Sequence, residues 1–164
     1  MTNPIDELKR RFPYMFLEPN LGINIAKGWS EHFEKLCVEI DQLLGQDKMG
    51  FHFTQCKEKF GEGRFYFRWG RNTAPMRVDI QTPNGVLSFR NDPISRRKPR
   101  PGDDVKRKVE ELIAALESDT RSTCIVCSAP GKLHSHEGYL LVLCADHTRQ
   151  RESKTGLTET PWFD

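Results

Sequence analysis

Four residues near the C-terminus limit the possible folds of this 164-residue chain more than any other feature. Cys124 and Cys127 are followed, after a sixteen-residue spacer, by Cys144 and His147, which gives the pattern C-x2-C…C-x2-H. Pairs separated by two residues present both side chains from one tight turn, and zinc takes four such ligands in a tetrahedron. Because the protein fills every position around the ion, we expect one structural Zn2+.

The residues between and after the two ligand pairs predict a compact module. Pro130 and Gly131 favour a sharp turn directly after the first pair, and Leu140 to Leu143 form a short apolar run typical of a strand. Helix-compatible residues follow the last ligands, from Ala145 to Ser153. This order of turn, hairpin and helix predicts a treble-clef or zinc-ribbon-like knuckle.

Length and residue pattern divide the rest of the chain. A chain of 164 residues is close to the usual size of one domain. We expect an N-terminal arm at 1–28, an α+β core at 29–120 with a basic, proline-rich loop at 91–104, the zinc module at 121–153 and a tail at 154–164. The tail contains Trp162 and Phe163, which either fold back as an apolar clip or stay free for a partner.

Two helices and two β-hairpins are predicted for the core. Apolar residues recur every three or four positions from Trp29 to Leu44 and from Val105 to Leu116, which is the spacing of one helical face. Apolar and polar residues alternate between Phe51 and Trp69, around a turn at 57–63, and the turn sequence Asn84-Gly85 separates two short alternating runs. The predicted fold class is α+β, with a small antiparallel sheet packed by two helices. The second hairpin either stands apart or extends the first.

Cysteine usage and hydropathy indicate the compartment. The chain has five cysteines, an odd number, and the two outside the ligand pattern, Cys37 and Cys56, fall in apolar-patterned segments. A disulfide framework is therefore not expected, which favours a reducing, cytoplasmic location. No apolar run has the length of a signal peptide or of a membrane span, so we expect neither secretion nor a membrane partner.

Positive charge is concentrated in the middle of the chain. From Lys57 to Lys108, fourteen Lys and Arg stand against six Asp and Glu, although the net charge of the whole chain is only +2. This asymmetry is typical of a cationic face for a polyanion or an acidic partner, and equally of a solvated basic loop. Strand alternation predicts a solvent face where guanidinium groups contact phosphates and an aromatic ring stacks on a base. The predicted binding residues are Arg64, Tyr66, Arg68, Arg71, Arg96, Arg97, Lys98, Arg100, Lys106 and Arg107.

The order of these motifs resembles a known group of proteins. The run Gln55-Cys-Lys-Glu-Lys-Phe-Gly, the following Arg64-Phe-Tyr and the terminal C-x2-C…C-x2-H pattern are similar to those of a family of small uncharacterised proteins common in bacteriophage and prophage genomes. The resemblance covers the chain from Gly28 to His147. Gly63 stands where that family often has leucine, and residues 73–104 look like an insertion. The resemblance implies a fold, a phage origin and a location in the cytoplasm of the infected bacterial host, but no chemistry.

Two functions follow from these observations. We favour a zinc-binding phage accessory protein that binds a host protein or nucleic acid through its basic surface, and so inhibits host defence or redirects host machinery. No glycine motif for phosphate or dinucleotide binding is present, so no small-molecule cofactor is expected. The alternative is a small metal-dependent nuclease of the HNH type with His134 and His136 as catalytic residues. Sixteen residues between the ligand pairs are few for that motif. One of these histidines could instead compete with His147 as the fourth zinc ligand.

Overall fold

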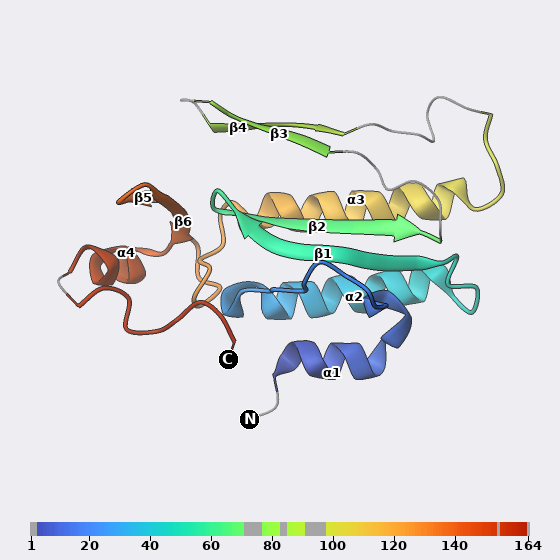
Figure 1. Ribbon diagram of the computed structural model, residues 1–164, viewed down its shortest axis with the longest axis horizontal. Coiled ribbons are helices and arrows are strands. Elements are labelled where there is room, and N and C mark those ends of the chain that lie inside the picture. Colours follow the sequence, from blue (N-terminus) through green and yellow to red (C-terminus); the bar gives the residue numbers. More distant parts are fainter. Residues whose placement is uncertain (1–2, 71–76, 83–84, 91–97, 154, 164) are drawn as a thin grey trace.

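The structure is a computed structural model that describes residues 3–70, 77–82, 85–90, 98–153 and 155–163. Within these ranges, four α-helices and three antiparallel strand pairs follow one another along the chain (Figure 1). In order they are α1 (Pro4–Arg11), the 3-10 turns η1 (Pro13–Phe16) and η2 (Lys27–Trp29), α2 (Ser30–Leu44), β1 (Phe51–Lys59), β2 (Glu62–Trp69), β3 (Arg77–Thr82), β4 (Gly85–Arg90), α3 (Asp103–Thr120), β5 (Lys132–His136), β6 (Tyr139–Leu143) and α4 (Ala145–Glu152).

The hairpin β1–β2 forms the centre of the molecule. Its strands pair from Phe51 opposite Trp69 to Lys59 opposite Glu62. The turn consists only of Phe60 and Gly61, which both have positive φ, 58° and 79°. This backbone twist matches that of the flanking strands, so a two-residue turn suffices. The expected turn at 57–63 is therefore too long, and Lys57 to Lys59 belong to the strand.

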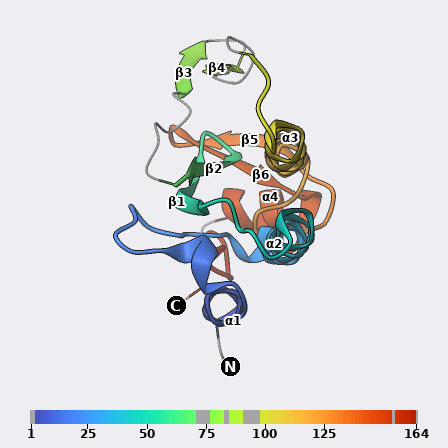
Figure 2. The ribbon, with the colours of Figure 1, turned by 90° about the vertical axis from the view of Figure 1, so that its right-hand side faces the viewer.

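Helices α2 and α3 lie side by side on one face of this hairpin (Figures 1 and 2). The Phe33 ring of α2 lies 5.3 Å from that of Phe53 and 5.5 Å from that of Phe65, which joins the helix to both strands. From α3, Val109 and Ile113 are fully buried in the same core. The helical periodicity thus gave the correct inner faces, and the predicted α+β class is confirmed.

The N-terminal segment packs onto this core. Leu8 of α1 and Met15 and Phe16 of η1 are buried in the same hydrophobic cluster as α2. Further along, the segment runs beside β1, where the Leu21 amide donates to the Thr54 carbonyl (2.8 Å) and the Asn24 amide to the Cys56 carbonyl (2.9 Å). The backbone of the segment is therefore fixed against the edge of the central hairpin.

The second hairpin, β3–β4, is a separate two-stranded sheet, and its apolar face points outward. Val78 pairs with Phe89 and Ile80 with Leu87. These four side chains are 48–58% exposed. Strand alternation places polar residues on the opposite face, so the orientation of the hairpin must be stabilised by polar contacts beneath it.

A buried ionic cluster provides those contacts. Five charged side chains, each at most 8% exposed, meet between β2, β3 and α3: Glu62, Arg64, Arg77, Asp79 and Glu117. Arg77 donates to both carboxylate oxygens of Glu117, at 2.9 Å each, and Arg64 lies 3.4 Å from Asp79. Burial raises the pKa of Asp79, but hydrogen bonds from Ser88 and Arg77 and the adjacent guanidinium groups outweigh it, so the pKa falls to about 2. Buried charges of this kind are tolerated because they are paired.

Candidate metal centre and binding surface

The predicted metal ligands converge at one end of the molecule. Cys124 and Cys127 lie in the loop between α3 and β5, Cys144 immediately precedes α4, and His147 is in its first turn. Their ligand atoms, three Sγ and the histidine nitrogen, all lie within 4.8 Å of one another. The hairpin β5–β6 connects the two pairs, so the order is turn, hairpin and helix, as expected for a zinc knuckle.

The separations of the ligand atoms fit a tetrahedral ion. With metal–sulfur and metal–nitrogen bonds of about 2.3 and 2.0 Å, neighbouring S and S atoms lie about 3.8 Å apart and S and N atoms about 3.5 Å apart. Cys127 Sγ is 3.8 Å from Cys144 Sγ, and His147 Nδ1 is 3.4, 3.5 and 3.1 Å from the sulfurs of Cys124, Cys127 and Cys144. Four of the six separations between ligand atoms therefore fit one tetrahedral metal ion held by these four side chains.

The backbone of the knuckle explains why the ligands converge. The Cys124 amide donates to the Ala129 carbonyl (2.8 Å) and the Ser128 amide returns to the Cys124 carbonyl (3.1 Å), so the chain reverses within six residues. Ser128 takes a positive φ of 63° to close this turn. The turn holds the Cys124 and Cys127 side chains on one side.

Hydrogen bonds to the Cys144 sulfur favour its thiolate form, which is the form that binds a metal cation. Burial raises the pKa of the Cys144 thiol, but the backbone and ring of His147 outweigh this, and the pKa falls to about 7. The pKa of Cys127 is instead raised, to about 11, by burial and by the neighbouring Cys124. Binding of a metal ion by all four side chains would therefore require the Cys127 thiol to release its proton.

Gly28 is the position where the core and the knuckle meet. A Cβ atom at Gly28 would lie 2.1 Å from the Cys124 carbonyl oxygen and 2.7 Å from the Ile125 carbonyl carbon. The Gly28 amide donates to the Ile125 carbonyl (2.9 Å), and the Ser128 hydroxyl donates to the Gly28 carbonyl (2.5 Å). Trp29 Nε1 donates to the Thr123 carbonyl (3.1 Å) in the next contact along the chain. The knuckle is thus built onto the start of α2.

The two histidines of the nuclease alternative lie on β5, away from the ligand set. His134 Nε2 is 3.0 Å from a Glu152 oxygen, and its ring is stacked on that of His136 at 6.2 Å. The Arg151 guanidinium lies beside them and donates to the Tyr139 carbonyl. In the described part of the chain, neither histidine belongs to a group of three or more metal-binding side chains, and His147 completes the cysteine site.

The predicted basic surface is only partly assembled. Arg68 is exposed and Tyr66 is half-buried on the face of β1–β2 opposite the helices. The expectation that Arg64 is exposed to solvent on this face is wrong, because Arg64 is completely buried between the ion pairs with Glu62 and Asp79. The hairpin β3–β4 covers this end of the strand, and sequence alternation could not reveal that cover.

The other predicted binding residues lie near the start of α3. Lys98, Arg100 and Arg107 are exposed, and the Lys106 ammonium lies 5.3 Å from the centre of the Trp69 ring. The end of β2 and the beginning of α3 are at the same end of the molecule (Figure 1). Arg71, Arg96 and Arg97 lie outside the described residues.

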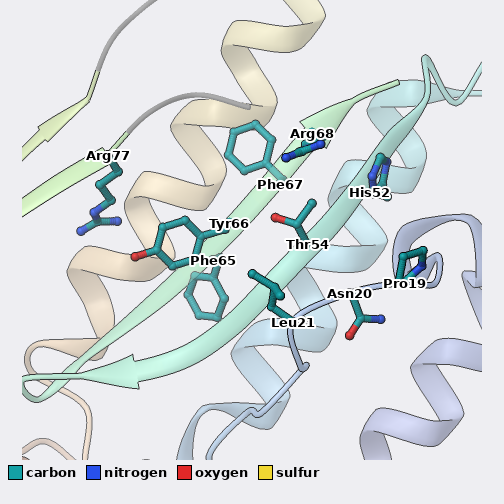
Figure 3. A pocket seen from close by; sticks show the side chains of 10 residues that line it. All are labelled: Pro19, Asn20, Leu21, His52, Thr54, Phe65, Tyr66, Phe67, Arg68 and Arg77. Carbon is teal, nitrogen blue, oxygen red and sulfur yellow. The ribbon is translucent and has the colours of Figure 1, made fainter. Parts of the chain in front are cut away.

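A pocket on the outer face of β1–β2 was not expected from the sequence. It has a volume of about 370 Å3, and Figure 3 shows the side chains around it. Tyr66, Arg68, His52 and Thr54 come from the two strands, and Arg77 from β3. The facing wall comes from the N-terminal segment, residues 19–21. Of the residues around the pocket, only Tyr66 and Arg68 were predicted from the sequence to bind a partner. The others belong to no motif, and they meet because the N-terminal segment, distant in sequence, lies against the strands.

Comparisons with protein-family models, curated proteins and solved structures gave no match. The resemblance to phage proteins therefore stays a prediction. In the described ranges, no helix is both long enough and apolar enough to cross a bilayer.

Proposed function

We propose that the four-ligand cluster binds one Zn2+ and that this ion is structural. Three cysteines and one histidine in a tetrahedral arrangement form a ligand set typical of structural zinc sites. The close contact of the cluster with Gly28 supports a role in folding. Metal analysis of the purified protein should give one zinc per chain, and Cys124→Ser should abolish it.

We propose further that the chain is a binding protein for nucleic acid. The observation that carries this proposal is the open face of β1–β2, where the Tyr66 ring and the exposed Arg68 lie beside a pocket. Guanidinium groups contact phosphates, and aromatic rings on an open sheet stack bases with little regard to sequence. The exposed cations Lys98, Arg100 and Arg107 extend the positive charge toward α3.

Fluorescence anisotropy with labelled single- and double-stranded DNA and RNA tests this proposal. We expect binding that weakens as salt rises, because phosphate contacts release counterions. Arg68→Gln should weaken binding about fivefold, whereas Arg10→Gln on the exposed surface of α1 should leave it unchanged. If no nucleic acid is retained at low salt, the proposal fails, and an acidic host protein becomes the leading partner.

The same samples test the nuclease alternative. Adding Mg2+ or Mn2+ should leave the bound nucleic acid uncleaved under our proposal. Cleavage that requires the added metal and disappears in the double variant His134→Ala, His136→Ala would establish the nuclease instead. The role as a phage accessory protein that acts on host machinery rests on the resemblance alone, and capture of a nucleic-acid-binding host complex from infected cells would support it.

A further inference from the structure

We infer that the pocket between the N-terminal segment and β1–β2 receives one unstacked nucleotide, so that the protein prefers a single strand to a duplex. The inference rests on the proposed nucleic-acid function and names its ligand. The described residues around the pocket supply the two features of a nucleotide site: surfaces for a planar ring, and the positive charge of Arg68 with no acidic residue in the lining.

One wall of the pocket is the Tyr66 ring. The Lys57 ammonium lies 5.4 Å from the centre of this ring, and Lys57 is not among the residues around the pocket. One face of the ring is therefore occupied by a cation, and the ring also lines the cavity. An aromatic ring that lines a cavity and has a cation over one face is suited to stacking on a base.

The opposite wall is an exposed leucine held by a rigid backbone. Leu21 is 77% exposed and is not part of the hydrophobic core cluster. Its amide donates to the Thr54 carbonyl (2.8 Å), and its carbonyl accepts from the Gln55 side chain (3.2 Å). Asn20 closes the preceding turn by accepting from the Gly22 amide (3.0 Å). The backbone that carries the leucine is thus held in place before a ligand binds.

The polar groups at the pocket suit an anion and the edge of a base. None of the described lining residues is acidic, and Arg68 is exposed with no ion-pair partner in the described part of the chain. His52 Nδ1 is 3.0 Å from the Gly50 carbonyl, so in the neutral ring this nitrogen carries the proton and Nε2 is left as an acceptor. Together with the Thr54 hydroxyl it can pair with the donors and acceptors of a base.

The size and shape of the pocket favour one nucleotide over a duplex. A volume of about 370 Å3 is at the lower end of small-molecule sites and leaves no room for a base pair with its two backbones. A base can enter only after it has left its stack, which is easiest in a single strand. A free mononucleotide and a nucleotide within a strand share this chemistry.

Calorimetric titration with nucleoside 5′-monophosphates, single-stranded oligonucleotides and a hairpin duplex tests the inference. We expect tighter binding of single strands than of duplex, and competition by a monophosphate. Tyr66→Leu should weaken single-strand binding by about five- to a hundredfold, the range for loss of one stacked base. Leu21→Ser should also weaken it, without loss of stability, because Leu21 is exposed.

Matched controls separate the pocket from general surface effects. Tyr139→Leu changes an exposed tyrosine on β6, and Leu17→Ser changes another exposed leucine of the same segment, so both should bind as the unaltered protein does. If oligonucleotides bind but Tyr66→Leu and Leu21→Ser leave the affinity unchanged, the pocket inference is overturned and the proposed function survives. If only monophosphates bind, and the two variants lose them, the pocket is a free-nucleotide site and the proposed function fails. Binding of neither overturns both.

Discussion

Replacing Gly28 by alanine should separate the knuckle from the core. Gly28 does not have a left-handed backbone conformation, so alanine can adopt the same φ. The substitution is unfavourable only because of the added Cβ atom. That carbon would lie 2.1 Å from the Cys124 carbonyl oxygen, whereas real Cβ contacts do not fall below 3.0 Å. Both partners are backbone, so the two segments must move apart by almost 1 Å.

The cost follows from what this movement breaks. The hydrogen bonds from the Gly28 amide to Ile125 and from Ser128 to the Gly28 carbonyl are each worth about 1 kcal/mol. Overpacking of the contact adds about 1–3 kcal/mol. We therefore expect the free energy of unfolding to fall by about 3–5 kcal/mol, a large part of the stability of an ordinary domain. Ser128→Ala should remove only about 1 kcal/mol of it.

Urea denaturation of the metal-loaded protein measures this loss. Gly138→Ala is the matched control, because it makes the same change in the turn of β5–β6, where a Cβ meets nothing within 4 Å but φ is 84°. It should cost about 1–2 kcal/mol through backbone strain alone. If Gly28→Ala were as stable as Gly138→Ala, the close contact would not hold the knuckle, and the argument would be wrong.

Four further predictions concern the metal, the ionic cluster and the packing around Gly63. Removing the metal with a chelator should lower the thermal midpoint and expose the amides of the knuckle to hydrogen exchange, and added zinc should restore both. The pKa of Asp79 is about 2 in the folded chain against an ordinary 3.8, so this carboxylate contributes about 2 kcal/mol to the free energy of unfolding above pH 4. That contribution is lost as the pH falls to 2. Asp79→Asn should therefore flatten the dependence of stability on pH between pH 4 and pH 2. Glu117→Ala leaves the Arg77 guanidinium without its main carboxylate and should cost about 3–5 kcal/mol in urea, whereas a loss below 1 kcal/mol would show that the pair does not stabilise the fold. Gly63→Leu places a carbon 2.9 Å from the Phe65 ring and should cost about 1–3 kcal/mol, and a variant of unchanged stability would contradict the packing.

Local patterns predicted the elements that local forces form. The three- and four-residue spacing of apolar side chains gave the buried faces of α2 and α3, because a helix that covers a sheet must bury one face. The pairs C-x2-C and C-x2-H gave the ligand cluster, because the spacing alone fixes a shared turn. The alternation between Phe51 and Trp69 gave β1 and β2 and the inward rings of Phe65 and Phe67.

The features that could not be predicted from the sequence depend on contacts between segments that are far apart in the chain. Alternation placed Arg64 on the outer face correctly but could not tell that β3–β4 covers that face, so the residue is buried. The sequence of residues 77–90 does not predict which face of the hairpin turns inward, because that face is fixed by ion pairs with Glu62 and Glu117 in other segments. The pocket depends likewise on residues 19–21 reaching across to β1. Gly63 could be seen as unusual in the sequence, but its close approach to Thr120 appears only in three dimensions.

The shared core of the knuckle and the helices bears on the life of the chain in a cell. Ile125, Val126 and Leu143 belong to the same buried cluster as Leu8 and Phe33. A chain synthesised during metal starvation would leave those apolar side chains uncovered and would be a substrate for proteases that remove incompletely folded proteins. The amount of this protein would then follow the metal supply of the cell.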